Sequence, residues 1–497
     1  MNRCRAVWIL LVIAVFNSSA SAGDFMDIRL SWVLAENNFL VEPGETSVNS
    51  PGIGIGANEN NTLFFDNYDT KYTGFETFGH LVLYKKMPAF FENFNAEAAL
   101  VLRIGAQYLD DEGSYIRMTY DFSDGFTDDE NIELTLFPLS GDRFRLGYSY
   151  TLSWAADDIF PLRATFVPAV KLQLNIGWGY CFVGLKTTQI RETLGDTSQT
   201  ELVTNYGTMA GLGVDIEGFV VEVNGGYFTR GTFEHEGVRG RGLYLSGISY
   251  QVGYHQGTEI GASIDFELYK NDPYMETLFF LPEEYDGGLS FVIKHEGTFL
   301  THNLLDPDER GQMSQQLAYA FDVNFSLKYG YFRIHLDAII RSLSFLLHEV
   351  PSFTPFQNYP DGVETSPEYW AAVGVDYHFP STRLTPGIKF GFKQPATYTT
   401  QNLSVGGVSF AGGRTIVVNS RQSRSILPEG EGALIVWSVK ASLKWDYAEM
   451  LSLVAEIYYA YDDNHTRYES DFWGLNIMSR FVDPNVLGLN LMAQARF

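Results

Sequence analysis

VLGLNLMAQARF, residues 486–497, is the stretch that decides the fold. Counted back from Phe497, every second residue is apolar: Ala495, Ala493, Leu491, Leu489 and Leu487. The residues between them are Arg496, Gln494, Met492, Asn490 and Gly488. Successive side chains of a strand point to opposite faces, so the segment predicts a strand with one apolar and one mostly polar face. A helix would scatter the polar residues around its surface.

An aromatic residue placed directly on the C-terminal carboxylate gives this strand a second distinguishing feature. The combination resembles the closing strand of outer-membrane β-barrel proteins, in which this ending is the signal recognised by the barrel-assembly machinery. The resemblance implies that Phe497, Ala495, Leu491 and Leu489 form an assembly signal. It also implies the assembly machinery, outer-membrane lipid and lipopolysaccharide as partners, and the outer membrane of a Gram-negative-type bacterium as the location.

The first 22 residues predict a secretory signal peptide. Arg3 and Arg5 form a basic start, residues 6–16 are apolar, and Ala20-Ser21-Ala22 matches a small-residue cleavage site. The apolar run is too short to span a bilayer. Residues 23–497 are therefore expected to be exported. Only Cys181 remains in them, which excludes an internal disulfide.

The composition favours β-structure. Aromatic residues make up 15% of the 497 residues, and 47 residues are glycine. The formal net charge of −26 argues against a nucleic-acid partner. It fits either a lumen that favours cations or a solvated acidic surface, and the sequence leaves both open.

Alternation continues through nearly all of residues 23–497. Several apolar faces extend over about nine to thirteen residues, close to the ~9–11 of a tilted transmembrane strand. Aromatic residues bracket some of these faces, as membrane interfaces favour. The bracketing pairs are Trp437 and Trp445, Phe144 and Trp154, and Tyr319 and Tyr329.

The predicted fold is all-β: a single transmembrane antiparallel β-barrel of about 20 strands (range 18–22) without a plug domain. The first strand, Met26–Leu34, is expected to pair with residues 486–497 and close the barrel. An even strand count also requires a strand near Val408–Val418. The predicted inserted loops are 35–74, 270–287, 301–315, 349–367 and 394–414. Because so wide a barrel would leak, loop 35–74 or loop 394–414 is expected to fold inward.

The best polar constellation lies on a predicted strand, Tyr331–Leu347. Alternate residues of this strand would point into the lumen, where charges set the field that a solute feels. An ion-pair network that only supports the wall is the competing interpretation. His335 lacks a second His or Cys at ligand spacing, so no metal and no cofactor is predicted. The lumen candidates are Arg333, His335, Asp337 and Arg341, with Lys440, Lys444 and Glu456 on later strands.

The predicted function is an outer-membrane channel for passive or substrate-biased diffusion of small solutes. Alternatives are an exporter of polysaccharide or other cargo, a conduit for hydrophobic compounds, a non-conducting structural or adhesive barrel, and a soluble secreted β protein. The sequence contains no G-x-S-x-G, H-E-x-x-H, P-loop or paired C-x-x-C motif, so an enzyme is not expected. The solute, the ion selectivity and the oligomeric state stay open.

Overall fold

A computed structural model describes most of the exported part of the chain. The signal peptide, Phe497 and residues 270–286 of one predicted loop lie outside the described residues. The described residues are 25–40, 52–55, 63–66, 79–104, 109–111, 113–122, 130–141, 144–147, 149, 152–154, 167–193, 200–233, 237–257, 287–306, 308–309, 311–347, 358–359, 363–400, 403–405, 408–410, 413–419, 424–448, 450–470 and 477–496.

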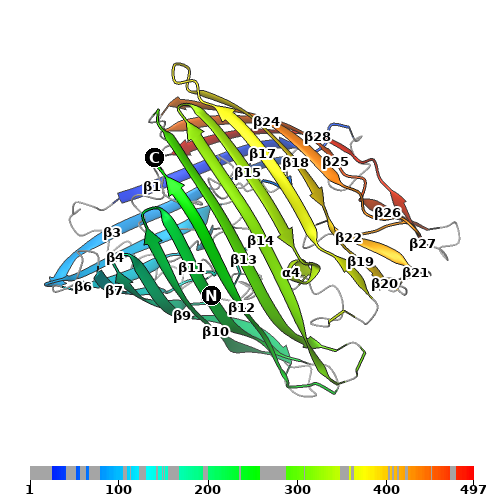
Figure 1. Cartoon of the computed structure of the whole chain (residues 1–497), viewed down its shortest axis with the longest axis horizontal. Helices are drawn as coiled ribbons and strands as arrows, with labels where there is room; N and C mark the ends of the chain where they lie inside the picture. The colour runs from blue at the N-terminus through cyan, green and yellow to red at the C-terminus, as the bar shows by residue number, and fades with distance from the viewer. Residues whose placement is uncertain are drawn as a thin grey trace.

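One large antiparallel sheet of 20 strands dominates the fold (Figure 1). Two short members, β2 (Gly52–Ile55) and β5 (Leu109–Asp111), pair along parts of β1 and β4. The other 18, called the wall strands, each pair with the next, and the last pairs with the first. The wall strands are β1 (Phe25–Glu36), β3 (Gly79–Phe91), β4 (Phe94–Ile104), β6 (Tyr115–Asp121), β7 (Glu130–Phe137), β8 (Ala169–Ile176), β9 (Gly179–Thr193), β10 (Thr200–Ile216), β11 (Phe219–Thr232), β12 (Gly242–Gln256), β13 (Leu289–Leu305), β14 (Met313–Tyr329), β15 (Phe332–Arg341), β17 (Glu368–Tyr377), β18 (Leu384–Gln394), β24 (Val436–Ala448), β25 (Leu451–Tyr461) and β28 (Asn485–Arg496).

The predicted pairing of the first and last strands is confirmed. Strands β1 and β28 are antiparallel, with Arg29 opposite Arg496 at one end and Glu36 opposite Leu489 at the other. The amide of Gln494 also donates a hydrogen bond to the Ser31 hydroxyl, at 3.2 Å. The hydrogen-bonded edges of these two strands are therefore covered by each other.

The two ends of the sheet differ. At the end where β1 begins and β28 ends, called the turn end, β10 and β11 are joined by residues 217–218 and β14 and β15 by residues 330–331. Gly218 and Gly330 have φ values of 86° and 58°, which a residue with a Cβ rarely adopts. Longer connections lie at the opposite, loop end, including 37–78, 138–168 and 395–435. The long connection 257–288 is the exception at the turn end.

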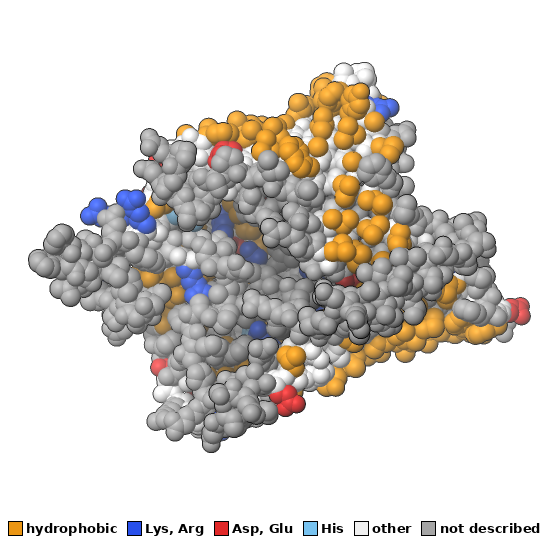
Figure 2. All heavy atoms as spheres, turned by 180° about the vertical axis from the view of Figure 1, so that it is seen from behind, with side chains coloured by type: hydrophobic (Ala, Val, Ile, Leu, Met, Phe, Trp, Pro, Cys, Tyr) orange, Lys and Arg blue, Asp and Glu red, His pale blue; other side chains and the backbone are white. Residues whose placement is uncertain are grey.

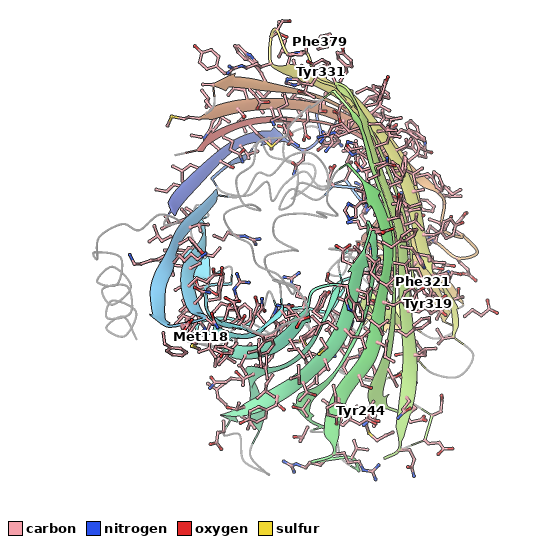
Figure 3. The ribbon with its side chains drawn as sticks, turned by 60° about the vertical axis from the view of Figure 1, so that its left-hand side comes forward. Met118, Tyr244, Tyr319, Phe321, Tyr331 and Phe379 are labelled. Carbon is pink, nitrogen blue, oxygen red and sulfur yellow. The ribbon has the colours of Figure 1, made fainter. Side chains whose placement is uncertain are left out.

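The faces of the sheet follow the two-residue period predicted from the sequence. On β24, Trp437 and Leu443 are 37% and 43% exposed, whereas Ser438 and Lys440 between them are buried. On β25, Ile457 is exposed and Glu456 is buried. Tyr319, Phe321, Tyr331 and Phe379 point away from the interior (Figure 3). The wall strands thus have an apolar outer face and an inner face that carries the charged side chains.

Small sheets occupy part of the loop end. They are β16 (Glu364–Ser366) with β19 (Ala396–Thr400), β22 (Arg414–Val418) and β23 (Arg424–Ile426), then β20 (Leu403–Val405) with β21 (Val408–Phe410), and β26 (Thr466–Ser470) with β27 (Ile477–Phe481). The first of these packs on a short helix, α4 (Leu343–Leu347), through a core that includes Leu346 and Tyr398. Among the described residues, no helix is long and apolar enough to cross a membrane.

Three boundary predictions are therefore wrong, and a fourth is right in position but not in local structure. Residues 408–418 form no wall strand, because β21 and β22 pair within the small sheets. Loop 394–414 does lie in the connection between wall strands β18 and β24, but it contains short strands instead of irregular chain. Most of loop 301–315 is strand, since β13 continues to Leu305 and β14 begins at Met313. The strand predicted to reach Leu347 ends at Arg341, because the following apolar residues turn into α4 and its core.

Candidate functional site

The inner face of β15, β17 and β18 carries a first group of ion pairs. Arg333 Nε lies 2.9 Å from Asp376 Oδ2, and His335 Nε2 lies 3.0 Å from the same oxygen. Asp337 Oδ2 lies 3.2 Å from Lys389 Nζ. The sequence predicted the inward direction of the three β15 side chains. It missed their partners, because those partners lie on neighbouring strands.

A second group lies closer to the loop end of the same strands. Arg341 Nη2 and Lys393 Nζ approach the two oxygens of Glu368, at 2.5 and 2.9 Å. Glu368 is nearly inaccessible to solvent, so both cations stabilise a carboxylate that has lost most of its hydration. Arg341 is thus separated from Arg333 along β15, and the two act on different partners.

Lys440 and Glu456 form a third group on β24 and β25. Lys440 Nζ lies 3.2 Å from Glu456 Oε1 and 2.5 Å from Oδ1 of Asp66, which is not a wall residue. The predicted candidate Lys444 is not part of this group. It pairs with Asp446 at 3.3 Å, near the turn end and partly exposed.

The partner Asp66 belongs to the first of two inward segments, which are residues 63–66 and 144–154. Residues 63–66 form a tight turn in which the Asp66 N–H donates to the Leu63 carbonyl at 2.9 Å. Phe65 is 2% exposed and packs in the buried cluster of the inner face. Residues 63–66 of the predicted loop 35–74 therefore contact the inner wall, which agrees with the expectation that this loop folds inward.

The second inward segment overturns a prediction. Phe144 and Trp154 were expected to bracket a transmembrane strand, but they are 0% and 2% exposed and lie in the same buried cluster as Phe65. Leu146 and Trp154 exchange two backbone hydrogen bonds, of 2.9 and 3.0 Å, in an isolated bridge. An alternating apolar pattern fits any extended segment with a covered side, whether lipid or protein covers it.

Three hydrogen bonds join segment 144–154 to polar groups of the inner face. Lys186 Nζ donates to the Phe144 carbonyl at 2.9 Å. The Ser149 N–H donates to Glu296 Oε2 at 2.6 Å, and the Trp154 indole N–H donates to the Ser249 hydroxyl at 2.5 Å. These three anchors come from β9, β13 and β12, so the segment spans several wall strands.

Glycines of the inner face make room for both segments. A Cβ on Gly184 would overlap the ring of Phe144. A Cβ on Gly391 would stand 2.8 Å from Cδ1 of Phe65, closer than carbon atoms approach in folded proteins. The rings of Phe144 and Phe65 therefore occupy space that only glycine leaves on the wall.

The two segments and the wall share one apolar cluster. Its wall members include Phe182, Met209, Phe228 and Trp370, and Phe64 contacts Trp370 with ring centroids 5.7 Å apart. Figure 2 shows Lys and Arg side chains within the hollowed middle of the molecule and hydrophobic side chains over the flanks. The inner face is thus mixed, with ion pairs beside an aromatic cluster. Within the described part of the chain, no three His, Cys, Asp or Glu side chains are grouped to hold a metal ion.

Comparisons with known proteins give only distant similarity. No protein-family model matches the sequence, and no curated protein matches it. Among solved structures, Pseudomonas aeruginosa OpdQ is 8% identical, with 95% of this chain and 97% of that chain covered, at a TM-score of 0.43. The outer membrane protein OpdK of the same species is 8% identical, with 95% and 98% covered, at 0.42. OmpT, an outer-membrane protein of Vibrio cholerae, is 9% identical, with 96% and 99% covered, at 0.35. Similarity this distant assigns no function to this chain.

Proposed function

We propose that this chain is an outer-membrane β-barrel closed by β1 and β28, and that small solutes diffuse through its lumen. The observation that carries the proposal is the contrast between the two faces of the same strands. Outer residues such as Leu317 and Tyr329 are exposed and apolar, whereas buried inner residues such as Lys440 and Glu456 are charged. A soluble protein rarely exposes contiguous apolar surface beyond a few hundred Å².

The spacing of the aromatic residues supports insertion in a bilayer. Tyr319 and Tyr329 lie ten residues apart on β14, so they share a face; Tyr319 points away from the interior (Figure 3) and Tyr329 is exposed. At about 3.4 Å per residue and a tilt of about 45°, this spacing corresponds to an apolar band about 24 Å tall. A bilayer also requires that backbone polar groups be paired, and the pairing of each described wall strand with two neighbours supports the proposal.

The charged inner face supports a hydrated lumen. Arg333, Lys389 and Lys393 alternate with carboxylates around one sector of the wall, and such pairs are costly without water or further hydrogen bonds. A permeating solute would experience the field of these groups. The inward segments 63–66 and 144–154 would narrow the path and so limit leakage through a wide barrel.

A non-conducting scaffold is the second candidate. The apolar cluster that joins both inward segments to the wall favours it, because a filled lumen stabilises a barrel without conducting. We further propose that the chain has no catalytic activity, and that Phe497, Ala495, Leu491 and Leu489 act as the assembly signal.

Conductance separates the two candidates. The refolded protein is inserted in planar bilayers, and single-channel steps are recorded beside a gel assay for heat-modifiable, assembled barrel. A channel gives discrete steps, which grow when residues 63–66 are replaced by Gly-Ser-Gly-Ser. If the barrel is assembled but neither the native protein nor this variant gives conductance steps, the channel is refuted and the scaffold is favoured.

A further inference from the structure

We propose that Trp370, Lys389, Gly391 and Lys440 form a binding site for an acidic-aromatic peptide unit, meaning an aromatic side chain followed by a carboxylate side chain. Residues 63–66 occupy this site as a tethered ligand. The role of the site in permeation rests on the proposed channel function, whereas the site itself does not.

The aromatic ring is recognised by the shape and charge of the wall. The Phe65 ring lies against Gly391, where a Cβ would stand 2.8 Å from Cδ1. Lys389 Nζ lies 5.1 Å from the ring centroid and Lys440 Nζ lies 6.0 Å from it. Both distances fall within the range of cation–π attraction. The pocket thus selects a flat ring that fits beside the ammonium groups of the two wall lysines.

The main chain next to the ring is recognised as well. Lys389 Nζ donates a hydrogen bond to the Phe65 carbonyl at 3.1 Å. A ligand therefore needs a carbonyl one residue before its carboxylate, which a peptide supplies. The preceding ring, Phe64, packs edge-on against Trp370.

The carboxylate completes the recognition. Asp66 Oδ1 accepts from Lys440 Nζ at 2.5 Å, while Oδ2 accepts from the Leu63 N–H at 3.0 Å. The second bond closes the turn, so the segment presents ring and carboxylate in a fixed relation. A charge-assisted bond of this kind is roughly twice as strong as a neutral one.

When residues 63–66 leave the site, each of the two wall lysines keeps a carboxylate partner. Lys389 keeps Asp337 at 3.2 Å, and Lys440 keeps Glu456 at 3.2 Å. Removing one partner of a buried ion pair is costly when nothing replaces that partner, and here each lysine retains a wall carboxylate. The site therefore persists when it is emptied, and a solute of matching chemistry exchanges with the tethered segment.

The test uses the full chain in detergent with its own segment removed from the site by the double change Phe65→Ala and Asp66→Ala. Binding of N-acetyl-Phe-Asp-amide is measured by calorimetry, with N-acetyl-Phe-Asn-amide as the matched probe that lacks the charge. The emptied variant is expected to bind the Asp peptide at least about tenfold more tightly than the Asn peptide. The native chain is expected to bind the Asp peptide at least about tenfold more weakly, because its own segment competes.

Two further changes in the emptied variant locate the site. Lys440→Met should abolish the preference for the Asp peptide, whereas Lys444→Met, a lysine of the same strand outside the pocket, should leave it intact. If Lys440→Met does not fold, Gly391→Ala tests the ring pocket instead and should weaken both peptides. Equal binding of the two peptides, or no binding to the emptied variant, would overturn the proposal. Binding by a barrel that never conducts would refute the channel and leave the site standing.

Discussion

An arginine placed at Ala441 tests the orientation of β24 in the membrane. Ala441 is on the exposed outer face, four residues from Trp437 and four from Trp445. Four residues span about 14 Å along the strand, or about 10 Å of depth at a tilt of about 45°, so Ala441 lies near the middle of the apolar band. Its cross-strand neighbours Ile388 and Ile457 are also exposed and apolar.

The expected cost follows from that depth. Ala441→Arg should destabilise the folded barrel by about 2–4 kcal/mol, because an arginine at the midplane has only lipid around it. Leu443→Arg lies nearer the aromatic boundary and should cost about 1–2 kcal/mol. Ser442→Arg points inward, directly across from Glu456, and should cost less than about 1 kcal/mol.

The measurement is guanidinium unfolding of the protein in lipid vesicles, followed by the fluorescence of its Trp residues. Ala441→Leu serves as the control for side-chain size and should not destabilise. Equal costs at positions 441 and 442 would refute the assignment of the two faces. A larger cost at 443 than at 441 would move the membrane midplane toward the turn end.

Three other changes test separate features of the molecule. Gly184→Leu should displace the Phe144 ring and, in a conducting barrel, raise single-channel conductance; an unchanged conductance would mean that segment 144–154 does not narrow the path. Burial raises the pKa of Asp462, but hydrogen bonds from His465 and from the following turn outweigh it, so this pKa lies below its ordinary value of 3.8. The resulting stabilisation is present above pH 3.8 and is lost as the pH falls through the lowered value; protection of the 462–484 connection from hydrogen exchange, corrected for the intrinsic exchange rate, should decrease as the pH falls below 3.8, and Asp462→Asn should remove that dependence. Deleting Phe497 should reduce the amount of assembled barrel in cells without reducing export, and normal assembly would contradict its role as a signal.

The faces of the wall strands could be predicted from sequence, because the two-residue period is a property of the backbone. Leu491 is exposed and Asn490 is buried, as the alternation in residues 486–497 predicted. The inward direction of Arg333 and Asp337 followed from the same rule. The pairing of the two end strands was inferred from the need to cover both edges of a sheet.

The partners of the inner charges could not be predicted, because they depend on register between strands. A shift of one residue would place a different side chain opposite Arg333. Asp66, the partner of Lys440, was still harder to predict. It lies 374 residues earlier in the sequence, in a segment without a periodic pattern. The inward segment 144–154 was mistaken for a wall strand, because its covered apolar side gives the same alternation as a lipid-facing one.

The pairing of β1 with β28 has a consequence for how the molecule is made. Ser31 and Gln494 are hydrogen-bonded although they lie 463 positions apart, so this pairing joins the earliest and latest parts of the sheet to be synthesised. Contacts of such long sequence separation form slowly, because closing the intervening chain is entropically costly. Until that moment the growing sheet has two open edges, each able to pair with another chain. A slower closure would therefore lengthen the time in which an open edge can pair with another chain and aggregate.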